Sequence, residues 1–248
     1  MAAEVGESAK LRMPPLPASD GRRTEQVMEA VREALNTGVM RAGEKYSVYQ
    51  LADALGISRT PVRDALLRLE EVGLIRFEAR QGFRIQVPDP REIADIFAIR
   101  LALELPATAR AARICDDALA SRLRDRMRQL AKAMRAADAR AFARHDQLLH
   151  DDILDAAGNA RARAIVRSLR ESTRLLGATT ARTLAEIDAE HQPVIDAIVA
   201  NRPSDALTAM RLHLTSTGRL LVAQAIRDQN VDLDSDQVWD DAVSRETR

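Results

Sequence analysis

The chain changes character at Pro88-Asp89-Pro90. Before this point, short apolar stretches alternate with turn residues, and seven of the ten glycines lie there. After it, the sequence is rich in Ala, Leu and Arg, and its apolar residues recur at helical spacing. Because long helices without glycine pack into bundles, the second part is expected to be all-α. We therefore predict two domains of different architecture in a mainly α-helical chain.

Three short helices are predicted in the first part. Apolar residues recur every four positions over 24–35, which indicates the first helix. Ser47 stands three residues before Gln50, the spacing of a capping box, and starts a second helix that ends at Gly56-Ile57. A third helix follows, with its buried positions at Val62, Leu66 and Leu69. The last two helices therefore meet across a tight turn.

A small β-hairpin is predicted directly after these helices. Ile75 and Phe77 alternate with polar residues, 80–82 form a turn, and Phe83, Ile85 and Val87 alternate again. A helix pair followed by a hairpin is the shape of a winged helix-turn-helix, which places its second helix in the major groove of DNA. The first part is therefore predicted to read double-stranded DNA.

The start of the third helix carries the candidate DNA contacts. Its buried positions leave four residues pointing outward: Ser58, Arg59, Thr60 and Arg63. Arginine can bind guanine O6 and N7 with two hydrogen bonds, and Ser and Thr hydroxyls suit phosphates. The alternative is a solvated basic face without a ligand. The capping box, turn, hairpin and clustered arginines together favour DNA binding.

The run LADALGISRTPVRDAL over 51–66, with Leu69-Glu70 and Gly73-Leu74-Ile75, resembles the GntR family of bacterial transcription regulators. The resemblance covers 24–88 and implies a winged helix-turn-helix. It implies DNA contacts at the four outward residues named above and places Gly82 at the wing. Tyr49-Gln50 depart from members that have Arg or Glu-Arg there, which affects the preferred operator more than the class.

The rest of the chain divides at further breaks in the helical pattern. These fall near 115–116, 137–138, 158–159, 177–182 and 201–203, and leave about six helices of roughly 15 to 25 residues. The predicted domains are a disordered N-terminal arm over 1–21, a DNA-binding domain over 22–88, an all-α domain over 89–228 and an acidic tail over 229–248. The tail has six acidic and two basic residues and is predicted to be mostly disordered, with Val238 and Trp239 as a docking spot.

Composition excludes several other classes of protein. Lys and Arg total 37, as do Asp and Glu, so the formal net charge is zero and does not indicate a class of binding partner. There is no uninterrupted apolar run of ~20 residues and no signal-peptide pattern, so no membrane crossing and a cytoplasmic location are expected. Cys115 is the single cysteine, so one chain can form neither a disulfide nor a thiolate metal cluster. A metal would have to bind histidine and carboxylate side chains.

Such a set of side chains is present in the second part. Asp146 and His150 are four residues apart, so they share one side of a helix. His191 and His213 each fall in an apolar pattern that faces the bundle core. One aspartate and three histidines can bind Zn²⁺, Ni²⁺ or Mn²⁺. The alternative is a group of buried histidines that only satisfy hydrogen bonds.

Arg100 is a candidate for anion binding. It lies four residues after Ile96 and seven after Ile93, on the apolar stripe of its helix. A buried guanidinium needs an anion to offset its desolvation. That anion is either the carboxylate of a small effector or Glu104, which lies one turn further along.

The region from about residue 91 to 228 is similar to the FCD ligand-binding domain of the FadR subfamily of the same regulators. It has the Asp-x-x-x-His, Ala-Gly-Asn and two later histidines of that domain, here Asp146, His150, Ala157-Gly158-Asn159, His191 and His213. The resemblance implies a divalent ion held by the aspartate and the histidines, with Zn²⁺ favoured and Ni²⁺ or Mn²⁺ as alternatives. It also implies a small effector beside the ion, frequently a carboxylate, with Arg100 and Asn159 as its contacts.

The leading hypothesis is a transcription regulator, most often a repressor in this family. It would bind a pseudo-palindromic operator as a homodimer, with an affinity that the effector controls. A metal-dependent hydrolase or lyase using the Asp/His site is the alternative, but it leaves 24–88 unexplained. An architectural DNA binder without a ligand is a third hypothesis.

Overall fold

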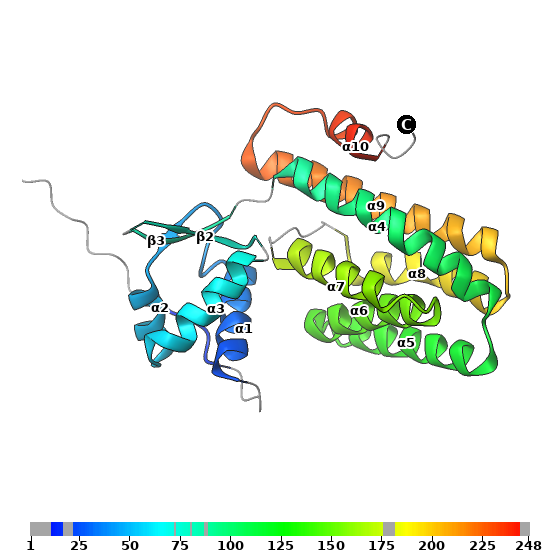
Figure 1. The fold of residues 1–248 in the computed structure, drawn as a ribbon, viewed down its shortest axis with the longest axis horizontal. Helices are drawn as coiled ribbons and strands as arrows, with labels where there is room; N and C mark the ends of the chain where they lie inside the picture. The colour runs from blue at the N-terminus through cyan, green and yellow to red at the C-terminus, as the bar shows by residue number, and fades with distance from the viewer. Residues whose placement is uncertain are drawn as a thin grey trace, which may run out of the picture. The chain divides into compact units, whose positions relative to one another are not determined.

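The computed structural model describes residues 11–16, 22–71, 73–79, 81–86, 89–175 and 182–243. They form two compact units, of which the C-terminal one begins with α4 (Figure 1). The N-terminal unit combines helices with a small sheet, and the C-terminal unit is helical. The predicted winged helix-turn-helix followed by an all-α bundle is therefore confirmed.

The N-terminal unit is built on three helices, α1 (Arg23–Asn36), α2 (Val48–Leu55) and α3 (Arg59–Glu71). The predicted capping box at the start of α2 is present. The backbone N–H of Gln50 donates to Ser47 Oγ, and the backbone N–H of Ser47 donates to Gln50 Oε1, both at 3.0 Å. Gly56 ends α2 in the left-handed conformation, with φ 66°. The chain therefore turns sharply into α3, as predicted.

The sheet has the strand order β1-β3-β2, formed by β1 (Lys45–Tyr46), β2 (Ile75–Glu78) and β3 (Gly82–Ile85). β2 and β3 make the predicted hairpin, with Phe77 opposite Phe83. β1 was not predicted. Its two residues are too few to show an alternating pattern, and it is defined as a strand by its antiparallel pairing with β3.

Among the residues that the structure describes, the C-terminal unit contains the predicted six helices and one more. They are α4 (Pro90–Arg113), α5 (Asp117–Arg135), α6 (Ala139–Ala156), α7 (Ala160–Leu175), α8 (Leu184–Val199) and α9 (Pro203–Gln229). α4 packs along α9, and α8 packs between α9 and α5 (Figure 1). The helix breaks lie where the sequence predicted them, except that most of the break at 177–182 falls outside the described residues.

α7 is held by apolar contacts and ion pairs. Leu169 packs against the main core of the unit, and a separate apolar cluster joins α7 to α6 and α4: Ala107, Leu154, Ala157, Ala162 and Val166. Arg163 pairs with Asp155 at 2.6 Å, and Arg170 pairs with Asp146. α7 therefore places a guanidinium beside the inner face of α6.

The prediction that the acidic tail is mostly disordered was wrong for residues 235–243. These residues form α10 (Ser235–Val243), which packs on α4 and α9 (Figure 1). Val238 and Trp239, the predicted docking spot, are buried, and the Trp239 ring lies 6.1 Å from that of Phe97. A Cβ at Gly218 would come within 2.2 Å of the Trp239 ring. Because glycine has no side chain, Gly218 leaves space for the indole of Trp239.

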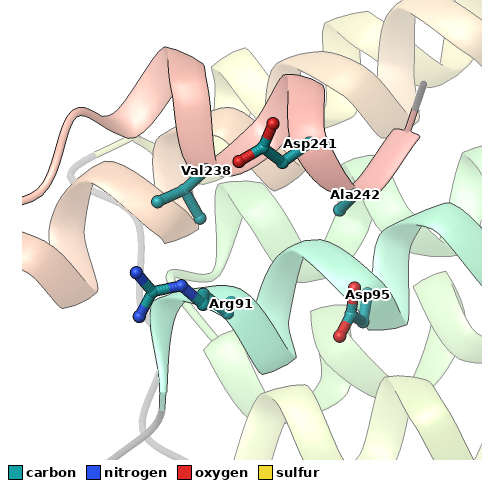
Figure 2. Close-up of a pocket in the computed structure, with 5 residues that line it drawn as sticks. All are labelled: Arg91, Asp95, Val238, Asp241 and Ala242. Atoms are coloured by element: carbon teal, nitrogen blue, oxygen red, sulfur yellow. The ribbon is translucent and has the colours of Figure 1, made fainter. Parts of the chain in front are cut away.

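A shallow pocket lies beside this contact. Side chains of α4 and α10 line it: Arg91, Asp95, Val238, Asp241 and Ala242 (Figure 2). Most of its groups are charged or small, so it adds little apolar contact. The attachment of α10 therefore rests mainly on Trp239 and Val238.

Part of the predicted N-terminal arm is ordered. Leu11, Met13 and Leu16 pack against the core of the N-terminal unit, so disorder was the wrong prediction for 11–16. Residues 1–10 and 17–21 lie outside the described residues. In the described ranges, no helix has the length and apolarity needed to span a bilayer.

Candidate functional site

The start of α3 presents the four candidate DNA contacts on one exposed surface. Val62, Leu66 and Leu69 are fully buried against the unit's core. The outward residues are all exposed: Ser58, Arg59, Thr60 and Arg63. The structure thus brings them together as the sequence predicted, and their contact with DNA stays a prediction.

Gly82 lies at the start of β3, in the wing. Its φ of +92° is one that L-residues rarely adopt, and a Cβ there would come within 2.2 Å of the carbonyl oxygen of Tyr46. The close approach of β1 to β3 therefore requires glycine. This structural reason is sufficient to explain Gly82 whether or not its backbone also contacts DNA.

The C-terminal unit brings the four predicted metal ligands together from three helices. α6 carries Asp146 and His150, α8 carries His191 and α9 carries His213. One ring nitrogen from each histidine lies within 4.8 Å of the others. The three imidazoles are at most 5% exposed. Residues up to 67 positions apart in the sequence thus form one buried donor set.

Several donor atoms in this set have no hydrogen-bond partner among the described residues. They are Nε2 of His150, both ring nitrogens of His191 and Oδ1 of Asp146. The Asp146 oxygen lies 2.9 Å from Nε2 of His191 and 3.8 Å from Nε2 of His150, but neither contact has the geometry of a hydrogen bond. Ligands bound to one ion at about 2.0–2.2 Å lie roughly 3.0–3.5 Å from one another. The atoms of Asp146 and His191 therefore lie at about the separation expected for two ligands of one ion.

Two glutamates orient two of the three imidazole rings by contacting their Nδ1 atoms. Nδ1 of His150 donates to Glu104, and Nδ1 of His213 lies 3.2 Å from Glu190. A carboxylate on Nδ1 places the proton there and leaves the Nε2 lone pair for a metal. The sequence indicated Glu104 only as a partner of Arg100, and it gave no signal for Glu190 beyond its position next to His191.

Two arginines complete the surroundings. Arg170 donates to the second oxygen of Asp146 and to Gln147. Arg100 donates to Glu104 at 2.7 Å and lies over the ring of Phe97. Of the two partners that the sequence left open for Arg100, the structure shows Glu104. Contact of Arg100 with an effector stays a prediction.

Asn159 is not brought to the histidines by any contact among the described residues. Its side chain is exposed, and its Oδ1 accepts a hydrogen bond from the backbone N–H of Ala162, which caps the start of α7. Contact of Asn159 with an effector stays a prediction. The capping bond accounts for an asparagine at this position.

Burial and neighbouring charges set the protonation of the site. Burial, together with the nearby Arg170, lowers the pKa of His150 to about 4. Burial and the neighbouring His191 lower the pKa of His213 to about 3. For Asp146, burial opposes ionisation, but Arg170 and His191 outweigh it and hold the pKa well below its usual value. At neutral pH, His150 and His213 are thus neutral and Asp146 is ionised, the forms that bind metals.

This protonation predicts a pH dependence for the metal-free protein. In the unfolded chain His150 and His213 take up protons near pH 6.5, whereas in the folded protein they stay neutral to about pH 4 and 3. The unfolded chain therefore binds more protons between these values, and folding stability is fully present above pH 6.5. We expect the free energy of unfolding to fall by about 2–4 kcal/mol from pH 7 to pH 5. Denaturant titration of protein from which metal has been removed by a chelator measures this free energy at each pH.

The double variant His150→Gln, His213→Gln is the matched control for this effect. It should flatten the profile between pH 5 and 7, because glutamine takes up no proton in either state. Carboxylates whose pKa is lowered, such as Glu190, act only below about pH 4.5. A flat profile in the unmodified chain would contradict the neutral histidine cluster.

Each of the two units matches a known protein family. The model of the bacterial regulatory proteins of the gntR family matches 23–85, and that of the FCD domain matches 95–216. The HTH-type transcriptional regulator Mce2R of Mycobacterium tuberculosis is 32% identical over 232 residues, covering 82% of this chain and 95% of its own. The chain belongs to the GntR family.

Two further matches agree with this membership. An uncharacterized HTH-type transcriptional regulator of Agrobacterium vitis is 32% identical to this GntR protein over 142 residues, covering 56% of this chain and 83% of its own. The structure of E. coli McbR/YncC has the same fold, with a TM-score of 0.65, 23% identity and coverage of 82% and 99%. The GntR protein is therefore a transcription regulator with a DNA-binding unit and an FCD effector-binding unit.

Proposed function

We propose that this GntR protein is a repressor that binds its operator as a homodimer and responds to a small carboxylate bound beside a divalent metal ion. The donor set of Asp146, His150, His191 and His213 would hold the ion. The observation that carries the proposal is the group of buried donor atoms without hydrogen-bond partners on α6 and α8, beside which His213 of α9 lies. A merely structural cluster of histidines would be expected to satisfy those atoms.

The chemistry of the donor set agrees with Zn²⁺, and Ni²⁺ or Mn²⁺ are alternatives. When bound, the ion would supply positive charge and coordination positions for oxygen ligands. Glu104 and Glu190 would hold two of the rings in place, which fixes where those positions point. Arg100 and Arg170, which lie beside the donor set, supply guanidinium groups suited to a carboxylate.

A homodimer follows from how such domains read DNA. One recognition helix contacts only a few base pairs, so two copies on a two-fold axis are needed for a specific operator. Leu212 and Leu220 lie two turns apart on one side of α9 and are 66% and 38% exposed. Exposed apolar side chains on one helix face support contact with a second copy.

Arg63→Ala is predicted to weaken operator binding. Loss of an arginine that contacts a base costs about 1–3 kcal/mol, or roughly 5- to 150-fold in affinity. Fluorescence anisotropy with a genomic fragment selected for binding measures the change. Arg128→Ala is the control, because that side chain is exposed on α5 and pairs only with Asp125 among the contacts described. Equal affinities for Arg63→Ala and the unmodified chain would contradict the prediction that Arg63 contacts a base.

Footprinting combined with metal analysis tests the proposal as a whole. We expect about one metal ion per chain in protein purified without chelators. We also expect a footprint with two related half-sites about one helical turn apart, and reporter expression that rises when the gene for the regulator is deleted. Metal-free protein, a single half-site or falling expression would each contradict one part of the proposal.

A further inference from the structure

A row of buried side chains runs from the C-terminal helix α10 to the histidine cluster. Trp239 of α10 packs on Phe97 of α4, with ring centroids 6.1 Å apart. The guanidinium of Arg100 lies over the Phe97 ring, 4.7 Å from its centroid. Arg100 donates to Glu104 at 2.7 Å, and Glu104 contacts Nδ1 of His150. All five residues are at most 4% exposed, so the row passes through the core of the unit.

Glu104 is the link between Arg100 and a candidate metal ligand. Its Oε1 accepts the hydrogen bond of Arg100 Nε, while its Oε2 contacts Nδ1 of His150. One carboxylate thus holds both partners, and a shift of Arg100 would move the oxygen that orients the imidazole. Groups that bind the far nitrogen of a ligating histidine fix the direction of its ring, and their loss typically costs about 10- to 100-fold in metal affinity.

Phe97 and Trp239 limit where the Arg100 side chain can lie. A cation is attracted to the face of an aromatic ring, and this attraction is stronger where water is excluded. Phe97 and Arg100 are three residues apart on α4, so they are neighbours on one side of that helix. Without Trp239, space opens into which the Phe97 ring can turn, and without Phe97, space opens into which the guanidinium can tilt away from Glu104. Close-packed interiors pass such a displacement from one side chain to the next.

From this row we infer that Phe97 and Trp239 are positioning residues of the metal site. They hold Arg100 on Glu104, and Glu104 holds the imidazole of His150. The inference rests on the proposed function and assigns the C-terminal helix a part in metal binding. The alternative is that the two rings only stabilise the fold, in which case their removal would lower stability and leave metal affinity unchanged.

The Zn²⁺ affinity of the full-length protein, measured by competition with a chromogenic chelator, tests the inference. Phe97→Leu keeps an apolar side chain but removes the ring face, and we expect at least about fivefold weaker binding. Phe83→Leu makes the same change at an equally buried position of the N-terminal unit, so it should leave the affinity within about twofold. Circular dichroism verifies that each variant is folded.

A double-mutant cycle separates positioning from a general loss of stability. Glu104→Gln should by itself weaken Zn²⁺ binding by about 10- to 100-fold. Its amide offers one acceptor oxygen in place of two, so the link from Arg100 to His150 is already broken. Adding Phe97→Leu should then cost less than about twofold more. A further loss as large as in the unmodified background would show that the ring acts on the fold as a whole, and would overturn the inference.

Two variants on α10 test the outer end of the row. Trp239→Leu should weaken Zn²⁺ binding at least about threefold, and Trp239→Phe, which keeps an aromatic ring against Phe97, should recover most of this loss. Unchanged affinity in Phe97→Leu, or in Trp239→Leu where Phe97→Leu does not fold, overturns the inference and leaves the proposed function standing. If the unmodified chain binds no Zn²⁺, the proposed metal site fails, and the positioning role fails with it.

Discussion

His213→Ala is expected to abolish metal binding and every response that depends on it. The imidazole of His213 is held by Glu190 and lies 4.5 Å, between ring centroids, from His191. Its removal leaves two histidines and one carboxylate. Loss even of a group behind a ligand costs about 10- to 100-fold in affinity, so loss of a ligand should cost more than about 100-fold. Inductively coupled plasma mass spectrometry after dialysis should show metal occupancy falling from about one ion per chain to below about 0.1.

His145→Ala is the matched control for this prediction. His145 lies on α6 between Arg144 and Asp146 but is not part of the histidine cluster. The variant should keep its metal and the rise in melting temperature that Zn²⁺ gives by binding the folded state. Circular dichroism verifies that both variants fold. Full occupancy in His213→Ala, with its fold intact, would show that the ion lies elsewhere.

Trp239→Ala is expected to destabilise the C-terminal unit by about 3–5 kcal/mol, the usual cost of removing a large buried aromatic side chain. Trp239 is 2% exposed and packs against Phe97 of α4. Arg219 lies over its ring, 5.6 Å from the centroid. Because Trp239 is the largest of the apolar side chains that attach α10, we expect the helix to detach. Urea titration followed by circular dichroism measures the loss.

Gly218→Val tests the same contact with the tryptophan kept. A Cβ at this position would come within 2.2 Å of the Trp239 ring and 2.8 Å of Phe97. The indole should therefore be expelled, and because it is the chain's single tryptophan, its fluorescence should shift to longer wavelength. Ile165→Ala, at a position 41% exposed on α7, is the control and should change stability by less than about 0.5 kcal/mol. An unchanged emission in Gly218→Val would contradict the docking of α10.

The parts of the structure that the sequence predicted rest on local patterns. Ser47 and Gln50 satisfy each other's backbone within one turn of helix, so their spacing alone defines the start of α2. The apolar stripe of α3 separates buried from exposed residues in the same way. For the metal site, the spacing of Asp146 and His150 showed that they share a helix face, but the positions of His191 and His213 needed the family resemblance as well.

The parts that it missed depend on residues far apart in the chain. β1 exists only because β3 pairs with it, and two residues carry no periodic pattern. α10 is stable because Gly218, 21 positions earlier, leaves space for Trp239. Glu190 acts on His213, which lies 23 positions later on another helix. Single charged residues are common on helices, so nothing in the sequence distinguishes this one.

Fluorescence anisotropy of operator DNA, titrated with metal-loaded protein in the presence and absence of a small carboxylate that raises its melting temperature, tests most directly whether the buried site controls DNA binding. We predict a change in affinity of about 1–3 kcal/mol, or roughly 5- to 150-fold, that disappears after chelation and in His213→Ala. An effector response of the same size in metal-free protein or in His213→Ala would contradict the account, because the signal would then not pass through the donor set.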